Sequence, residues 1–181
     1  LAGGLLFVAL FAHHGALWLA FKSEGDIHDR AVALAGKLWP VVAGLVVLFL
    51  VMSLFMTQLF ANYLVNPLLF VILLVAVAGL VLTMTYRKAG RILASWGASA
   101  VLIGSAALFG VVGIFPALLP SSLNPAYSLT IQNSSSSPMT LAIMLGVALV
   151  FVPIVIAYQI WTMRTFSHPV TKADLDYEEA Y

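Results

Sequence analysis

Long apolar runs alternate with short polar segments along this chain, and their lengths indicate membrane-spanning helices. A helix needs about 20 apolar residues to cross the roughly 30 Å hydrocarbon core of a bilayer. Five runs reach that length: residues 1–21, 39–63, 67–86, 92–115 and 139–163. They are too long and too uniformly apolar for the alternating strands of a membrane β-barrel. The pattern therefore predicts an all-α, polytopic transmembrane helix bundle with five membrane-spanning helices.

Polar residues and prolines between and within these runs predict where helices begin and bend. Asp26 is the expected cap of a helix that continues into the second run. Pro40 and Pro153 lie inside helical stretches and are expected to kink them. Ser137 followed by Pro138 is a favourable cap and first residue for the last helix.

The charged residues are placed asymmetrically about the five runs. All 8 Lys and Arg residues follow the first run, separate the third from the fourth, or follow the fifth. With five spans these three regions share one side of the membrane, and the positive-inside rule makes that side cytoplasmic. We therefore expect a cytoplasmic C-terminus and an outer position for the uncharged segment 116–138.

Composition supports a membrane protein and excludes several kinds of site. Of 181 residues, 62% are hydrophobic and 8% are charged, whereas about a quarter are charged in a typical soluble domain. The chain has no cysteine, which excludes disulfides and thiolate-ligated metals within it. The chain has no cluster of basic residues, so the sequence does not indicate nucleic acid as a partner. Since residue 1 is a leucine that already lies in an apolar run, we expect the sequence to be cut from a longer protein.

The predicted spans contain no Asp, Glu, Lys or Arg, and their only histidines are the adjacent pair His13 and His14. His13 and His14 lie about two turns from the cytoplasmic end of the first span, and adjacent helical residues point about 100° apart. They therefore cannot serve one metal or one haem together, and the sequence predicts no metal site. In one interpretation a histidine faces a cofactor, a quinone or a proton path. In the other, one is hydrogen-bonded to a neighbouring helix and the other leans toward a partner subunit or a cavity.

The remaining polar residues near the span ends have structural interpretations. Gln58 and Asn62 are four residues apart and are expected to form hydrogen bonds across helices. His28 and His168 fall in cytoplasmic segments and are expected to be solvated. Small residues four apart in the run 92–115 permit close helix contact. The segment 116–138 is uncharged and stiffened by proline, and we expect it to be ordered and to pack over the outer helix ends.

Several strings in the chain closely resemble subunit II of cytochrome bd-type quinol oxidases. They are "LLFVALFAHHGALWLAFKSEGDIHDRA", "FPALLPSSLNPAYSLTIQNSSSSPMTLAIML", "VFVPIVIAYQIW" and "TKADLDYEEAY". The similarity covers essentially the whole chain in order.

The resemblance implies a specific place in that subunit, which has nine membrane helices arranged as two four-helix repeats and a last helix. The five spans here would be helices five to nine. This implies a five-helix bundle over residues 1–163 and a cytoplasmic tail over 164–181. Within the bundle, a four-helix repeat covers 1–115, an outer loop covers 116–138 and the last helix covers 139–163.

For function, the resemblance implies a subunit of a quinol:oxygen oxidoreductase in a bacterial or archaeal cytoplasmic membrane. The complex oxidises quinol, reduces dioxygen to water and contributes to proton-motive force. The b- and d-type haems are expected in partner subunit I, and this chain is expected to ligate none. Its role would be assembly and stabilisation of the haem-bearing subunit, without catalysis by itself. Membrane lipids, a bound quinone and small accessory subunits are further expected partners.

No catalytic residue can be transferred from the family to a position of this sequence. His13 and His14 therefore remain the candidate cofactor-binding residues. Two alternatives stay open: a secondary transporter fragment, and a quinone- or lipid-binding membrane module. The absence of Asp, Glu, Lys and Arg from the predicted spans counts against the first.

Overall fold

The computed structural model describes residues 1–166 and 168, which divide into two compact units at 115/116. The first unit contains α1 (Ala2–Lys22), α2 (Gly25–Met56), α3 (Ala61–Val65), η1 (Pro67–Leu69), α4 (Phe70–Lys88) and α5 (Ile92–Ile114). The second contains β1 (Ala117–Leu119), η2 (Pro125–Tyr127), β2 (Leu129–Thr130) and α6 (Pro138–Thr165). Within these described residues, five helical segments are long and apolar enough to cross a membrane, which confirms the predicted fold class.

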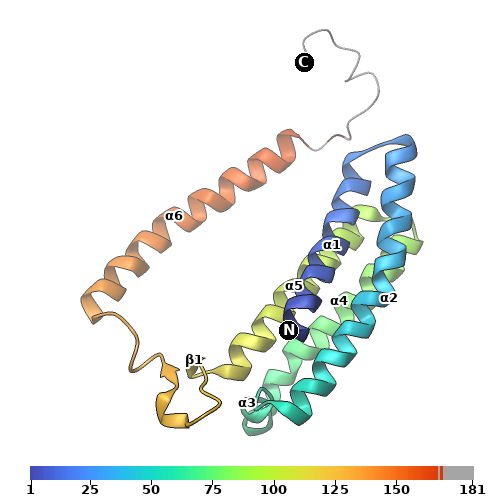
Figure 1. Ribbon diagram of the computed structural model, residues 1–181. Coiled ribbons are helices and arrows are strands. Elements are labelled where there is room, and N and C mark those ends of the chain that lie inside the picture. Colours follow the sequence, from blue (N-terminus) through green and yellow to red (C-terminus); the bar gives the residue numbers. More distant parts are fainter. Residues whose placement is uncertain (167, 169–181) are drawn as a thin grey trace. The chain divides into compact units, whose positions relative to one another are not determined.

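In the first unit, α1, α2, α4 and α5 lie side by side as a bundle (Figure 1). The most extensive contacts join α4 to α5 and α1 to α2, and α1 also packs against α5. The core contains Leu6 and Leu10 of α1, Val42 of α2, Ala76 of α4 and Leu102 of α5. All four long helices thus contribute to this apolar cluster, and a second cluster of Ala16, Leu17 and Ala35 joins α1 to α2.

Two tight turns connect the paired helices at one end of the bundle. Gly25 and Gly90 adopt positive φ angles of 63° and 72°, which side chains other than glycine rarely tolerate. The α1–α2 turn places the start of α2 at Gly25, with Glu24 as the N-cap and no side-chain cap bond. The prediction that Asp26 caps this helix is therefore wrong, because the glycine lets the helix begin earlier. Asp26 lies in the first turn instead.

The second helix continues through Pro40, as predicted, but ends before the predicted boundary at residue 63. It stops at Met56, where Thr57 becomes extended and its hydroxyl donates to the Ser53 carbonyl at 2.7 Å. The short helix α3 follows after a break and is anchored to α5 by side chains. A continuous apolar run thus contains two helices, because hydrogen bonds to α5 hold the second piece in its own position.

In the second unit, two short strands form an antiparallel pair before the long helix α6. Side chains bridge the loop: the Thr130 N–H donates to Asn133 Oδ1 at 2.7 Å, and Asn133 Nδ2 donates to the Ser128 carbonyl at 3.0 Å. These bonds confirm the expected order of the segment 116–138, and its packing over the helix ends stays a prediction. Ser137 caps α6 by accepting from the Thr140 N–H, with Pro138 in the first turn, as predicted.

Candidate functional site

The two predicted histidines lie on different sides of α1 and do not form one site. His13 is 1% exposed, and neither of its ring nitrogens has a hydrogen-bond partner among the described residues. His14 is half-buried and faces α5. This confirms the expectation that the two adjacent side chains point in different directions. The rotational position of α1 about its own axis determines which of them is buried.

His14 is held by α5 through a hydrogen bond and a ring contact. Its Nδ1 lies 2.6 Å from the Ser99 hydroxyl, which itself donates to the Trp96 carbonyl at 2.7 Å. Because that bond uses the only hydroxyl proton, Ser99 must accept from His14, and Nδ1 therefore carries the proton. The His14 ring also stacks on Trp96, with centroids 5.1 Å apart. Of the two interpretations, the hydrogen bond to a neighbouring helix applies to His14.

The two histidines do not come together as a pair of ligands for one haem, because His13 is enclosed by the bundle and His14 faces α5. His14 donates from Nδ1 to Ser99 and keeps a lone pair on Nε2, the arrangement that metal-binding histidines commonly have. His13 is enclosed by the bundle, with no room on the ring for a macrocycle. Within the part of the chain that the structure describes, no group of three or more His, Asp or Glu residues could hold a metal ion.

Other polar side chains that the sequence pattern did not single out join the helices from inside. Ser95 is fully buried and donates to the Thr83 carbonyl at 2.7 Å, which links α5 to α4. Trp39 Nε1 donates to the Leu80 carbonyl at 2.9 Å, which links α2 to α4. Ser95 and Ser99 could have been identified from the sequence by their four-residue spacing, which places both hydroxyl groups on one face of the helix.

An arginine near the α4–α5 turn also reaches into the bundle. Arg87 lies one residue beyond the predicted end of its span, but α4 continues to Lys88. Its Nη2 donates to Met84 Sδ at 3.2 Å, and a Cβ on Gly36 of α2 would lie 3.0 Å from its Nη1. The missing side chain at Gly36 therefore makes room for the guanidinium.

At the other end of the bundle, side chains of α3 fix this short helix to α5. Asn62 Nδ2 donates to the carbonyls of Val112 and Phe115 at 2.8 and 2.6 Å, which confirms the predicted bond across helices. Tyr63 is fully buried and donates to the Phe109 carbonyl at 3.0 Å. Burial raises the pKa of the Tyr63 phenol above its ordinary value, so the hydroxyl remains a donor.

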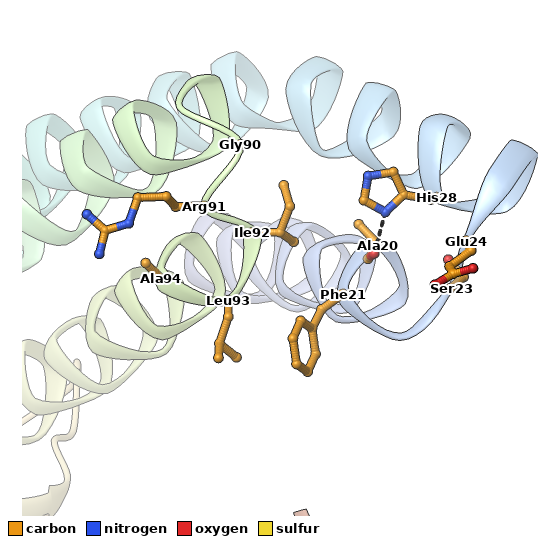
Figure 2. A pocket seen from close by; sticks show the side chains of 10 residues that line it. All are labelled: Ala20, Phe21, Ser23, Glu24, His28, Gly90, Arg91, Ile92, Leu93 and Ala94. Atoms are coloured by element: carbon orange, nitrogen blue, oxygen red, sulfur yellow. Dashed lines mark hydrogen bonds between the residues drawn. The ribbon is translucent and has the colours of Figure 1, made fainter. Parts of the chain in front are cut away.

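A pocket of about 590 Å³ lies where the α1–α2 and α4–α5 turns meet (Figure 2). Its polar residues are Ser23, Glu24, His28 and Arg91, and its apolar wall includes Phe21. His28 is half-buried, and its Nδ1 lies 2.6 Å from the Ala20 carbonyl. The prediction that His28 is simply solvated is therefore wrong, because the tight turn folds it back onto the end of α1. His168 is exposed, as predicted.

Comparisons with known proteins agree on one family. A family model described as "Cytochrome bd terminal oxidase subunit II" matches residues 1–166. The chain is 31% identical to "Cytochrome bd ubiquinol oxidase subunit 2" of Bacillus subtilis (strain 168), covering 93% of this chain and 49% of that protein. It is 29% identical to "Probable cytochrome oxidase subunit 2" of Haemophilus influenzae, covering 88% and 49%. It is 26% identical to "Cytochrome bd-I ubiquinol oxidase subunit 2" of Escherichia coli K12, covering 97% and 54%. The chain thus spans about half the length of these relatives.

Proposed function

The chain belongs to the cytochrome bd terminal oxidase subunit II family, and on that premise we propose that it forms the C-terminal half of such a subunit. The complex it serves would oxidise quinol and reduce dioxygen to water. The observation that carries the proposal is the family match over residues 1–166, which includes the five described helical segments that are long and apolar enough to span a membrane. The family resemblance predicted from the loop and first-helix strings is confirmed.

Within the complex, this chain acts as a scaffold for a haem-bearing partner subunit and ligates no haem itself. This scaffold role is supported by the hydrogen bonds that polar side chains make between the long apolar helices. His14, Ser95 and Trp39 each bond to a neighbouring helix of the same bundle. Hydrogen bonds between helices hold a bundle together where lipid offers no alternative partners. Such a unit presents a stable surface against which subunit I, with its b- and d-type haems, can assemble.

The subunit lies in the cytoplasmic membrane, with its C-terminus on the cytoplasmic side and the loop 116–138 outside. The support is the set of basic residues at the α1–α2 and α4–α5 turns, which include Lys22, Lys88 and Arg91. The tail 164–181 of the proposed domain division lies almost entirely outside the described residues. Purification of the tagged chain tests the proposed function: a haem-bearing subunit should co-purify with it.

Replacement of His13 tests whether this side chain contributes to the stability of the bundle. His13→Leu removes a buried imidazole that has no hydrogen-bond partner among the described residues, so the free energy of unfolding should stay unchanged or rise by about 1–3 kcal/mol. His14→Leu is the matched control, because it breaks the bond to Ser99 and should lower that free energy by about 1 kcal/mol. Thermal unfolding of the purified complex measures both.

Oxygen consumption by the same His13→Leu complex distinguishes the two interpretations of this residue. Unchanged turnover with normal haem content is expected for a scaffold. Slower turnover with normal haem content would contradict that role and assign His13 to a proton or quinone path.

A further inference from the structure

A second pocket, of about 540 Å³, lies along the first turns of α2 beside the end of α1. Its lining combines exposed apolar side chains with two exposed cations. The apolar residues include Leu19 of α1 and Leu34 of α2, and the cations are Arg30 and Lys37 of α2. Among the described residues that line it, none is acidic. This pocket, called the α1–α2 groove below, therefore suits an anion that carries an apolar part.

The length of α2 places the α1–α2 groove at the edge of the membrane. This helix has 32 residues, so it is about 48 Å long and exceeds the roughly 30 Å hydrocarbon core by about 18 Å. The excess lies at its N-terminal end, because every Asp, Lys and Arg of the helix precedes residue 38. Lys37 is therefore at the boundary of the hydrocarbon core, and Arg30 lies about 10 Å farther out.

Contacts between α2 and α4 agree with this depth. Trp39 donates to the Leu80 carbonyl two residues beyond Lys37, and tryptophan is enriched at membrane interfaces. A Cβ on Gly36 would lie 3.0 Å from Nη1 of Arg87, the residue before the last of α4. The helix α4 thus ends near the level of Gly36, and about three turns of α2 continue past it.

The two cations lie on the same side of α2 and two turns apart. Seven residues turn the helix by about 700°, so Arg30 and Lys37 differ in direction by only about 20°. An anion midway between them lies about 5 Å along the axis from each Cα, within reach of both long side chains. Basic side chains at the edge of the hydrocarbon core extend outward, which brings the Lys37 ammonium toward this level. The lipid phosphate lies at the same level, just outside the core.

The nearest carboxylates of α2 do not come between these cations. Asp26 lies four residues before Arg30, on the side away from the membrane, and Asp29 points about 100° away from Arg30. Neither of them lines the α1–α2 groove. The groove therefore presents its two positive charges to the lipid.

We propose that the α1–α2 groove binds the phosphate of an anionic phospholipid whose headgroup is otherwise uncharged, as in phosphatidylglycerol. Arg30 and Lys37 both donate charge-assisted hydrogen bonds to this one phosphate. Val41, one turn deeper in the membrane on the same side of α2, is exposed and contacts the first part of an acyl chain. A single phosphate is thus held from both sides, and no second charged group has to be reached.

Charge selects this headgroup over the zwitterionic alternatives. Phosphatidylethanolamine and phosphatidylcholine carry a cationic group beside the phosphate, which the two basic side chains repel. A basic residue at the membrane surface favours an anionic lipid by about fivefold, so the two together should give a preference of about twentyfold.

Lipid retention by the protein purified with its natural partner subunits tests the proposal. The delipidated sample is equilibrated with equal amounts of phosphatidylglycerol, phosphatidylethanolamine and phosphatidylcholine that share the same acyl chains, and bound lipid is counted by native mass spectrometry. Lipids at other sites are common to all variants, so the difference between variants isolates the α1–α2 groove. This readout does not depend on oxidase activity, so the present proposal and the proposed function can fail separately.

Four variants sharpen the test, and each changes an exposed side chain. Lys37→Gln should reduce the preference for phosphatidylglycerol about fivefold, the double variant Arg30→Gln/Lys37→Gln should abolish it, and Lys37→Arg should retain it. Lys88→Gln is the matched control, because it removes a positive charge at the same end of the bundle but outside the groove, and it should preserve the preference. Equal retention of the three lipids by the parent protein, a preference that survives in the double variant, or equal effects of Lys37→Gln and Lys88→Gln would overturn the proposal.

Discussion

Tyr63→Ala should lower the free energy of unfolding by about 3–5 kcal/mol, the cost of deleting a large buried aromatic side chain. Tyr63 is 0% exposed and lies among the rings of Phe60, Phe70 and Phe109, with centroid distances of 6.1, 5.6 and 5.0 Å. Its hydroxyl also donates a hydrogen bond to the Phe109 carbonyl of α5. The alanine variant therefore loses both the aromatic cluster and the bond that anchors α3.

Tyr63→Phe is the graded control for this prediction. It keeps the ring in the cluster and removes only the hydrogen bond, so the loss should be about 0.5–1.5 kcal/mol. Thermal or detergent-induced unfolding of the purified complex measures both variants. A Tyr63→Ala complex that unfolds at the same midpoint as the parent would contradict the role of this residue.

Gly113→Ala should lower the free energy of unfolding by about 1–3 kcal/mol through overpacking. A Cβ at this position would lie 2.7 Å from Leu59 Cδ2 and 2.8 Å from the Leu59 carbonyl oxygen. The second contact is with backbone, so α5 and the connection between α2 and α3 would have to separate. Close approach at this glycine is thus what permits the short helix α3 to lie against α5.

Gly110→Ala, one turn earlier on the same helix, is the matched control. A Cβ there meets nothing within 4 Å, and alanine favours the helix by about 0.5–1 kcal/mol over glycine. The two substitutions should therefore shift the unfolding midpoint in opposite directions. A shift in the same direction would show that contact with Leu59 does not limit the site.

Much of the fold could be predicted from the sequence, because membrane-spanning helices are determined by the length of apolar runs. The span positions, the passage of α2 through Pro40 and the Ser137 cap of α6 all depend on local chemistry. The end of α2 could not be predicted, because Tyr63 and Asn62 hold α3 through bonds to residues about 50 positions away.

The candidate sites depend on relations between helices, which a single sequence does not encode locally. Adjacent histidines were expected to diverge, but the burial of His13 and the bond from His14 to Ser99 follow from how α1 is rotated against α5. The pocket of Figure 2 is likewise lined by Glu24 and Arg91, which belong to two turns far apart in the chain. The contact of His28 with Ala20 could not be predicted either, because it depends on the tight turn at Gly25 and not on a local sequence pattern.

We propose that this chain supports a haem-bearing oxidase subunit without ligating haem itself. The most direct measurement is the absorption spectrum of the complex purified through a tag on this chain, together with the masses of its chains. We predict b- and d-type haem bands, a second large membrane subunit, and loss of those bands when that subunit is removed. A complex without haem bands or a haem-bearing partner, or haem that remains with this chain alone, would contradict the claim.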